Sequence, residues 1–462
     1  MKKLIIASSI ILIVGVFSCK KETVTSTPTS QEELATGKPP APPPPTSILQ
    51  WQQAYGSTFT DMGFSITHSS DGNGYVFAAS SLGNGGDVTG HHGPNTSADV
   101  WVVKTDNSGL ILWQKSIGGN GSDYPDHIIT TADGGYLIAA STTSNDGDVS
   151  GNHGGYDVWI VKLDASGTIV WSKTFGGNGD DANDLNRNAI VEASDGGFLF
   201  VGNTGSNDGD VAGTNHGARD AWVLKLSSTG SLLWQNTYGG TLNEEGNSII
   251  KTADGNYLVC GNAASTDGDL TSQINHGGVD GWLFKINNDG DLLWQKTYGG
   301  SQNDNWDGAR QGPDGAYVLS GTTQSSNGDV SGNTRYADPW IVKINATGGI
   351  AWQKFFGGAD VDNANIRDID ATGKIILTGV TSSKNGDISG QKGSSDMWVL
   401  RLDANGNKLN SIVLGGRSED KSEDAIVNPD GSYISIGRSS STDGDVTGNH
   451  GALDVWLAKF KF

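Results

Sequence analysis

Short apolar runs of four to eight residues alternate with turn residues along residues 48–462. One representative stretch contains the runs "HIITTA", "YLIAAS", "DVWIVKL" and "TIVWSKTF", which begin at positions 127, 136, 157 and 168. Their length and their content of Val, Ile, Trp and Tyr are typical of β-strands and exclude helices of useful length. The pattern therefore predicts an all-β protein.

The four-run pattern repeats about every 60 residues, seven times in all. A Trp near the start of the third run marks each copy, at Trp101, Trp159, Trp222, Trp282, Trp340, Trp398 and Trp456. Asp-Gly pairs such as Asp133-Gly134 separate the first two runs, and a short turn ending in Gly separates the last two, which are hairpin signals. Four antiparallel strands per repeat predict the blade of a β-propeller.

The two ends of the repeat region predict how the ring closes. The last copy stops after its third run, "DVWLAKFKF" at 454–462, whereas the fragment "WQQAYG" at 51–56 resembles a fourth run that follows nothing. Pairing the two leaves no open sheet edge between first and last blade, and open edges are a liability. We therefore predict a seven-bladed propeller at 48–462, rather than a linear solenoid, with the last blade closed by the N-terminal strand.

The unit "DGDVSGNHGGYDVWIVKLDASGTIVWSKTFGG" resembles the SBBP-type β-propeller repeats of bacterial secreted and surface proteins. The resemblance covers essentially all of 48–462. It implies the propeller fold but little about activity, although relatives are sometimes labelled endoglucanase-like.

The N-terminal 47 residues predict an anchor and a tether. Lys2-Lys3, an apolar run from Leu4 to Phe17 and the following Ser18-Cys19 have the layout of a secretory signal, and the apolar run is shorter than the ~20 residues of a membrane-spanning helix. The segment is similar to the lipobox of bacterial lipoproteins, which implies cleavage after residue 18, acylation of Cys19 and, with Lys20 next, delivery to the outer membrane, on its periplasmic face or the cell surface. Residues 19–47, rich in Pro, Thr and Ser, predict an extended tether.

Charge and cysteine content exclude several classes of protein. The chain has 51 acidic and 30 basic residues, so a nucleic-acid partner is excluded by the lack of a basic face. Its two cysteines, Cys19 and Cys260, provide neither a disulfide framework nor a cysteine metal site. We expect a monomer that requires no cofactor.

An aspartate after Gly recurs between the second and third runs, and a second acid recurs before the first run. Because Gly-rich acidic loops supply oxygen ligands, one interpretation is a set of Ca²⁺ sites; the other, which we favour, is that each carboxylate caps its own turn through backbone N–H groups. The calcium candidates are Asp87, Asp148, Asp210, Asp269, Asp329, Asp387 and Asp445.

Departures from the repeat provide the candidate binding residues. Trp306 is the Trp that belongs to neither repeated series, Arg310 is close to it, and the fifth and sixth copies replace an Asn-His-Gly motif. An aromatic ring beside cations on adjacent blades would suit a sugar with an acidic group, although drift of a redundant repeat explains the same changes. The candidates are Trp306, Arg310, Arg335, Tyr336, Arg367 and Lys392.

The sequence favours a lipid-anchored scaffold that binds a glycan or protein partner without catalysis. One alternative is a glycan-cleaving, endoglucanase-like enzyme, since two carboxylates suffice for glycoside hydrolysis; repetition of the acids prevents a pair from being singled out. The other is a calcium-stabilised structural or adhesion module.

Overall fold

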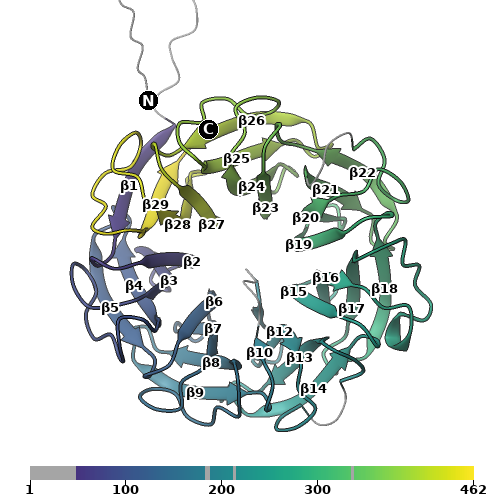
Figure 1. Cartoon of the computed structure of the whole chain (residues 1–462), viewed down its shortest axis with the longest axis horizontal. Helices are drawn as coiled ribbons and strands as arrows, with labels where there is room; N and C mark the ends of the chain where they lie inside the picture. Colours follow the sequence, from purple (N-terminus) through teal and green to yellow (C-terminus); the bar gives the residue numbers. More distant parts are fainter. Residues whose placement is uncertain (1–47, 183–187, 212–214, 334–337) are drawn as a thin grey trace, which may run out of the picture. The chain divides into compact units, whose positions relative to one another are not determined.

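The protein is a seven-bladed β-propeller, as the repeat predicted. The computed structural model describes residues 48–182, 188–211, 215–333 and 338–462. Seven antiparallel sheets stand around a common centre, each with its first strand innermost and its last strand at the rim (Figure 1). Among the described residues the one helical element is a single 3₁₀ turn, η1 (Gly268–Leu270).

Each blade runs from an inner strand a to an outer strand d. The innermost strands a are β2 (Asp61–His68), β6 (Asp123–Thr130), β10 (Asp181–Ala182) with β11 (Ile190–Glu192), β15 (Glu244–Lys251), β19 (Asp304–Gln311), β23 (Asp362–Ile369) and β27 (Asp420–Val427). Strands b are β3 (Gly74–Ser81), β7 (Tyr136–Thr142), β12 (Phe198–Thr204), β16 (Tyr257–Ala263), β20 (Tyr317–Thr323), β24 (Ile375–Thr381) and β28 (Tyr433–Ser439).

The outer half of each blade consists of strands c and d. Strands c are β4 (Asp99–Asp106), β8 (Asp157–Leu163), β13 (Asp220–Leu226), β17 (Asp280–Ile286), β21 (Asp338–Ile344), β25 (Asp396–Leu402) and β29 (Asp454–Phe460). Strands d are β5 (Ile111–Ile117), β9 (Ile169–Phe175), β14 (Leu232–Tyr238), β18 (Leu292–Tyr298), β22 (Ile350–Phe355), β26 (Lys408–Leu414) and, for the seventh blade, β1 (Leu49–Tyr55).

The a–b and c–d hairpins lie on one face of the ring, which we call the hairpin face, and the d–a connections and the longer b–c connections lie on the other, which we call the loop face. The predicted Asp-Gly hairpins form as expected: Gly134 has a φ of 85°, and Asp133 accepts a hydrogen bond from the Gly135 N–H at 3.0 Å. A residue with a Cβ rarely adopts this φ, which explains the repeated Gly.

The core lies between blades rather than inside a sheet. Strands b and c are buried on both faces because each blade packs against a blade on either side. The repeated Trp of strand c is fully buried at these interfaces, and its indole N–H is bonded within its own blade, as in Trp101 Nε1 to Gln114 Oε1 at 2.8 Å. The strand-c tryptophans thus explain the dominant sequence signal.

The seventh blade is closed by the N-terminal strand, as predicted. Its sheet has the order β1–β29–β28–β27, so the first and last strands of the chain are neighbours (Figure 1). The pairing runs from Leu49 opposite Phe460 to Tyr55 opposite Val455. Tyr55 is buried between the seventh and first blades, with its ring 5.6 Å from that of Phe77. The strand β1 therefore both completes a sheet and joins two blades.

Candidate functional site

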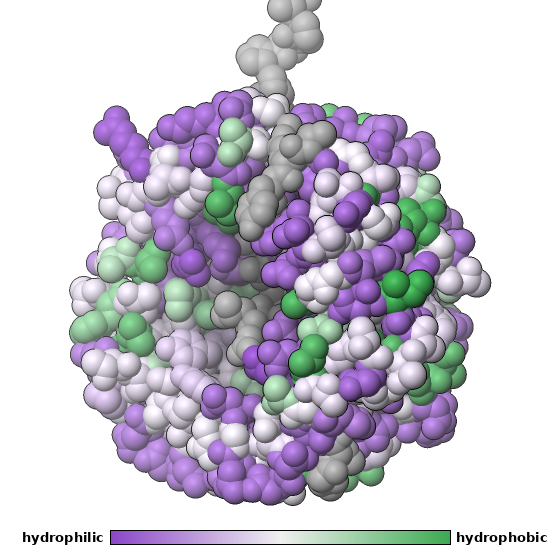
Figure 2. Space-filling model, turned by 45° about the vertical axis from the view of Figure 1, so that its right-hand side comes forward, coloured by the Kyte–Doolittle hydropathy of each residue, from purple (hydrophilic) through white to green (hydrophobic). Residues whose placement is uncertain are grey.

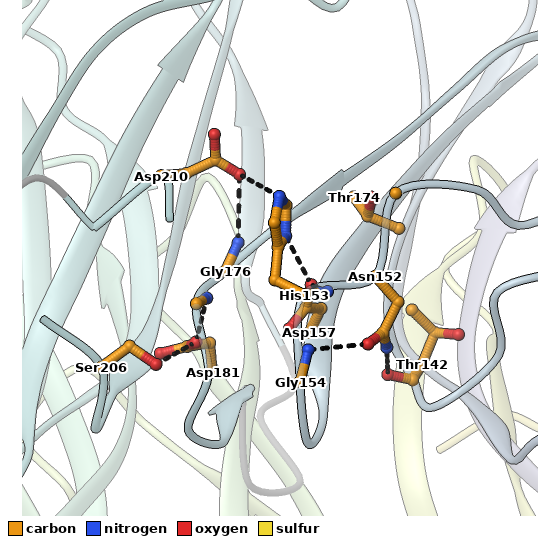
Figure 3. A network of polar contacts seen from close by, with 12 residues as sticks. Thr142, Asn152, His153, Gly154, Asp157, Thr174, Gly176, Asp181, Ser206 and Asp210 are labelled. Atoms are coloured by element: carbon orange, nitrogen blue, oxygen red, sulfur yellow. Dashed lines mark hydrogen bonds and ion pairs between the residues drawn. The ribbon is translucent and has the colours of Figure 1, made fainter. Parts of the chain in front are cut away.

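The aspartates of the Gly-Asp series clasp neighbouring blades together. In each blade the backbone N–H of this Asp donates to the carbonyl of the Gly that ends strand d of the preceding blade, at 2.8–3.0 Å. In six of the seven blades the carboxylate also accepts the N–H of that same Gly at 3.0–3.3 Å, as in Asp210 and Gly176 (Figure 3). The carboxylates of the Asp series therefore accept from backbone N–H groups, as the capping interpretation requires, but from those of the preceding blade rather than of their own turn.

The histidine of the Asn-His-Gly motif adds to the same clasp. His153 Nδ1 lies 2.9 Å from Asp157 Oδ2 of its own blade, and its Nε2 lies 3.9 Å from Asp210 of the next blade (Figure 3). Lys392 takes the equivalent position in the sixth blade, where its ammonium pairs with Asp445 of the seventh. The structure therefore places Lys392, a predicted ligand-binding residue, in an ion pair between blades.

Calcium would need a group of ligands that the described residues do not assemble from acidic, His or Cys side chains. Within residues 48–182, 188–211, 215–333 and 338–462, no three such side chains gather in a way that could hold a metal ion. We expect EDTA to leave the melting temperature of the full chain unchanged, because the clasp carboxylates are bonded to backbone N–H groups. A fall in melting temperature that added CaCl₂ reverses would contradict this expectation and restore the calcium interpretation.

Trp306 does not form an exposed platform, so that expectation is wrong. Its side chain is fully buried, and its ring stacks on Trp340 with centroids 4.4 Å apart. The large ring fits because strand c of the preceding blade has Gly281 where other blades have larger residues; a Cβ there would lie 2.5 Å from Trp306 Nε1. Trp306 is therefore a packing residue with a compensating glycine, and it cannot stack on a sugar.

Arg310 and Arg367 lie together, as predicted, but at the centre of the ring and bonded to the protein. Arg310 donates from Nε to the Arg367 carbonyl at 3.0 Å and from Nη2 to Asn188 Oδ1, two blades away, at 2.9 Å. Arg367 donates to Thr378 Oγ1 at 3.0 Å and to the Glu423 carbonyl, and its Nη1 lies 3.5 Å from Asp424 Oδ1. Because these nitrogens have protein acceptors, the two guanidinium groups connect the inner strands of neighbouring blades. They do not form the acid-binding site that the sequence suggested.

Arg367 reaches this position through a displaced β-bulge. In blades one, two, four, five and seven the bulge falls between the third and fifth residues of strand a, but in blade six it falls between Ile366 and Asp368. The two arginines line a central cavity of about 290 Å³ together with His127 and Asp424. Burial lowers the pKa of His127 to about 4, so this histidine is neutral at pH 7.

Three predicted residues, Cys19, Arg335 and Tyr336, lie outside the described part of the chain. The structure therefore does not test the lipidation site, nor these two ligand candidates.

A groove of about 790 Å³ on the loop face is a site that the sequence interpretation missed. It spans the first three blades, and Met62, Phe64, Tyr124 and Tyr156 form much of its wall, each half-buried. The polar lining comprises Asp126, Ser141, Asp180 and Arg219. Figure 2 shows the ring obliquely, with a largely hydrophilic surface that is hollowed toward the centre.

The signal for this groove was a change of polarity between blades. The residue after the first acid of strand a is Met62, Tyr124 or Ala182 in blades one to three. In blades four to seven the same position holds Glu245, Asn305, Asn363 and Lys421. An alignment of the seven repeats at this position would have shown that blades one to three have less polar residues at the groove than the other blades.

Two tyrosines give the groove its chemistry. Burial raises the pKa of Tyr156, with Tyr124 and Asp180 adding to the effect, so its hydroxyl stays protonated at neutral pH. Asp180 Oδ1 accepts the backbone N–H of Tyr156 at 3.0 Å and holds that loop in place. Both tyrosines line the groove and are half-buried, and a phenol hydroxyl can both donate and accept a hydrogen bond. The groove thus offers aromatic rings and hydrogen-bonding groups together.

Comparison with known proteins assigns the chain to no family. No family model matches the chain. One curated relative, the regulatory protein FlaEY of Caulobacter vibrioides, is 26% identical over 198 residues, which cover 38% of this chain and 20% of that protein. The match thus spans about a fifth of the relative's length.

Solved structures with the same architecture are distant in sequence. U3-55K is 9% identical, with 88% of this chain and 98% of that one covered and a TM-score of 0.45. The extracellular domain of a putative one-component system from B. thetaiotaomicron is 11% identical, covering 88% and 41%, with a TM-score of 0.43. An α-L-arabinanase of Penicillium chrysogenum is 10% identical, covering 89% and 98%, with a TM-score of 0.40.

No helix among the described residues has the length and apolar character required to cross a membrane.

Proposed function

We propose that this protein is an outer-membrane or cell-surface lipoprotein whose propeller binds a glycan without catalysis, in the groove over blades one to three. The observation that carries the proposal is the pair of half-buried tyrosines, Tyr124 and Tyr156, in the largest of the described cavities. The flat faces of aromatic rings suit the apolar faces of sugars, and the hydroxyl and carboxylate groups beside them suit sugar hydroxyls. The volume is within the range of known ligand sites.

The chain enters the ring on the face opposite to the groove. Leu49 pairs with Phe460, at the end of β29 that carries the c–d hairpins in the other blades. The chain therefore enters the ring at the hairpin face, while the groove opens on the loop face. We include in the proposal that the protein acts as a monomer without a cofactor.

Replacing the groove tyrosines is expected to weaken glycan binding selectively. After a polysaccharide array identifies a ligand of the full chain, Tyr124→Ala and Tyr156→Ala should each raise the Kd about tenfold, which corresponds to about 1.4 kcal/mol, in the range of a stacked aromatic contact. Asn305→Ala is the matched control, because Asn305 takes the repeat position of Tyr124 in blade five. Isothermal titration gives the Kd values, and circular dichroism checks that each variant is folded. Equal affinity in all four proteins would remove the groove from the proposal.

One observation keeps a glycan-cleaving enzyme as a second candidate. Asp126, which is buried, and Asp180, which is exposed, both line the groove, and glycoside hydrolysis uses two carboxylates across the scissile bond. Release of reducing sugar by the wild type, lost in Asp126→Asn while binding persists, would favour the enzyme. Binding without any release of reducing sugar would favour the scaffold.

A further inference from the structure

Pairs of buried carboxylates face each other where neighbouring blades meet on the loop face. One member starts strand c of a blade, and the other starts strand a of the next blade. At five junctions both carboxylates lie next to the same glycine, within 3.0 Å of the place its Cβ would take. The five pairs are Asp454 with Asp61, Asp99 with Asp123, Asp220 with Glu244, Asp280 with Asp304, and Asp396 with Asp420.

The junction that closes the ring shows the geometry most directly. Gly56, the residue after β1, separates Asp454 from Asp61, and a Cβ on it would lie 3.0 Å from Asp454 Oδ1 and 2.7 Å from Asp61 Oδ2. Both carboxylates have an exposed fraction of 0%. Two like charges this close and without water would repel each other strongly.

The strand-c member of each pair also has an oxygen without a partner. Oδ1 of Asp99, Asp220, Asp280, Asp396 and Asp454 is buried and accepts no hydrogen bond. In each pair this is the oxygen that lies beside the glycine and the second carboxylate. A buried anionic oxygen without a donor is costly, so the repeated arrangement requires a donor that the chain itself does not supply.

A metal ion does not meet this requirement. Calcium keeps its oxygen ligands at about 2.3–2.6 Å and needs six to eight of them. The place of the Gly56 Cβ, one C–C bond from its Cα, lies within 3.0 Å of both Asp454 Oδ1 and Asp61 Oδ2, and Asp454 Oδ2 and Asp61 Oδ2 already accept hydrogen bonds from His450 and Ser57. A proton needs no such space, supplies the missing donor and cancels one of the two charges.

We propose that each of these five junctions is a proton-binding site, in which one proton is shared between Oδ1 of the strand-c Asp and the facing carboxylate of the next blade. The folded ring is then more stable when these sites hold their protons. Mild acid therefore stabilises the contacts between blades, including the contact that closes the ring.

The surroundings of the closing pair act on proton binding in two directions: the donors to each carboxylate lower its pKa, whereas burial and neighbouring negative charge raise it, and burial is the largest effect. His450 donates to Asp454 Oδ2 from its backbone N–H at 2.6 Å, and its Nδ1 lies 2.8 Å from the same oxygen. Ser57 donates to Asp61 Oδ2 from N and Oγ at 2.6 and 2.9 Å, Ser81 of β3 also faces Asp61, and Asp87 adds negative charge. Burial raises the pKa of Asp61 and of Asp454; Asp87 adds to the rise at Asp61, and Asp61 adds to the rise at Asp454.

The sign of the pH effect follows from these directions. A carboxyl whose pKa is higher in the folded chain than its ordinary value of about 3.9 holds a proton that the unfolded chain releases. Its contribution to stability is complete near pH 4 and is lost as the pH rises through the raised pKa. The melting temperature should therefore fall as the pH rises above about 4, by about 1–2 °C per junction for a chain of this size.

Counting protons on unfolding tests the proposal. Calorimetric unfolding of the full chain at pH 5, in two buffers of different ionisation enthalpy, gives the number of protons released. We expect Asp61→Asn and Asp454→Asn each to release about one proton fewer than the wild type, since either substitution removes the shared site. Asp61→Asn leaves the contact between His450 and Asp454 in place, so agreement between the two variants excludes a histidine effect.

A surface carboxylate provides the matched control. Asp71 pairs with Lys104 at 2.8 Å, and this ammonium lowers the pKa of Asp71, so the carboxylate is ionised in both states at pH 5 and Asp71→Asn should not change the proton count. Equal proton release by the wild type and both junction variants would overturn the proposal. If the variants do not fold, infrared spectra of the wild type at pH 5 decide: buried carboxylic-acid C=O absorption supports the shared proton, and its absence refutes it.

Discussion

Deletion of residues 49–55 should destabilise the whole ring rather than trim its end. The deletion exposes the edge of β29 and removes Tyr55 from the interface with the first blade. Losing one buried aromatic side chain alone costs about 3–5 kcal/mol, and the paired backbone is lost with it. For a ring of this length we expect a fall in melting temperature on the order of 10 °C, measured by circular dichroism.

A variant in which the strand is moved to the C-terminus tests whether the missing strand itself causes the loss of stability, since it restores the seventh blade without the N-terminal position of β1. If Leu49–Tyr55 are moved behind Phe462 through a turn copied from Asp106–Gly109, the strand should pair with β29 as an ordinary hairpin, since Leu49 already lies opposite Phe460. Recovery of the melting temperature is the expected result. A deletion variant that melts like the wild type would contradict the closure.

Arg367→Met should also have a large effect, through the charge that it leaves behind. Asp424 is nearly buried and is held by Ser65 and Ile66 of the first blade as well as by Arg367. Removing one partner of a buried pair typically costs about 3–5 kcal/mol, because the remaining charge is buried without compensation. We expect chemical denaturation to show a loss of this size.

Two further variants show whether the charge is the cause. Arg367→Met combined with Asp424→Asn should recover part of the loss, since the amide oxygen still accepts from Ser65 while the uncompensated charge is gone. Arg417→Met is the surface control, because Arg417 is 88% exposed and its ion pair with Asp443 should be worth less than about 1 kcal/mol. Equal losses in the free energy of unfolding for the Arg367 and Arg417 variants would contradict the prediction that the buried ion pair of Arg367 stabilises the ring.

The repeat predicted most of the fold because its strongest signals are local. Strand runs and Asp-Gly turns depend on neighbours within one blade, the strand-c Trp recurs in every copy, and the spare strand at 51–56 indicated the closure. Lys392 was misassigned because the residue that pairs with it, Asp445, belongs to the next blade. A single repeat contains no information about such contacts between blades.

The candidate site was harder to predict because the position of each of its residues depends on contacts with residues of other blades. Trp306 stood out in its own blade, but the Gly281 that receives it lies in the preceding one. Arg310 is bonded to Asn188, which is 122 positions away. The groove differs from the rest of the ring in the polarity of one repeat position, not in any rare residue. A search for rare residue types therefore did not find it.

The entry of the chain through β1 also determines how the ring responds to mechanical load. Force transmitted through the residues before Leu49 acts along β1, and the hydrogen bonds from β1 to β29 run across the strand. Such a pull loads all bonds of the strand at once in shear, instead of opening them one after another. Tension along β1 would therefore be carried by the whole strand together with the buried Tyr55.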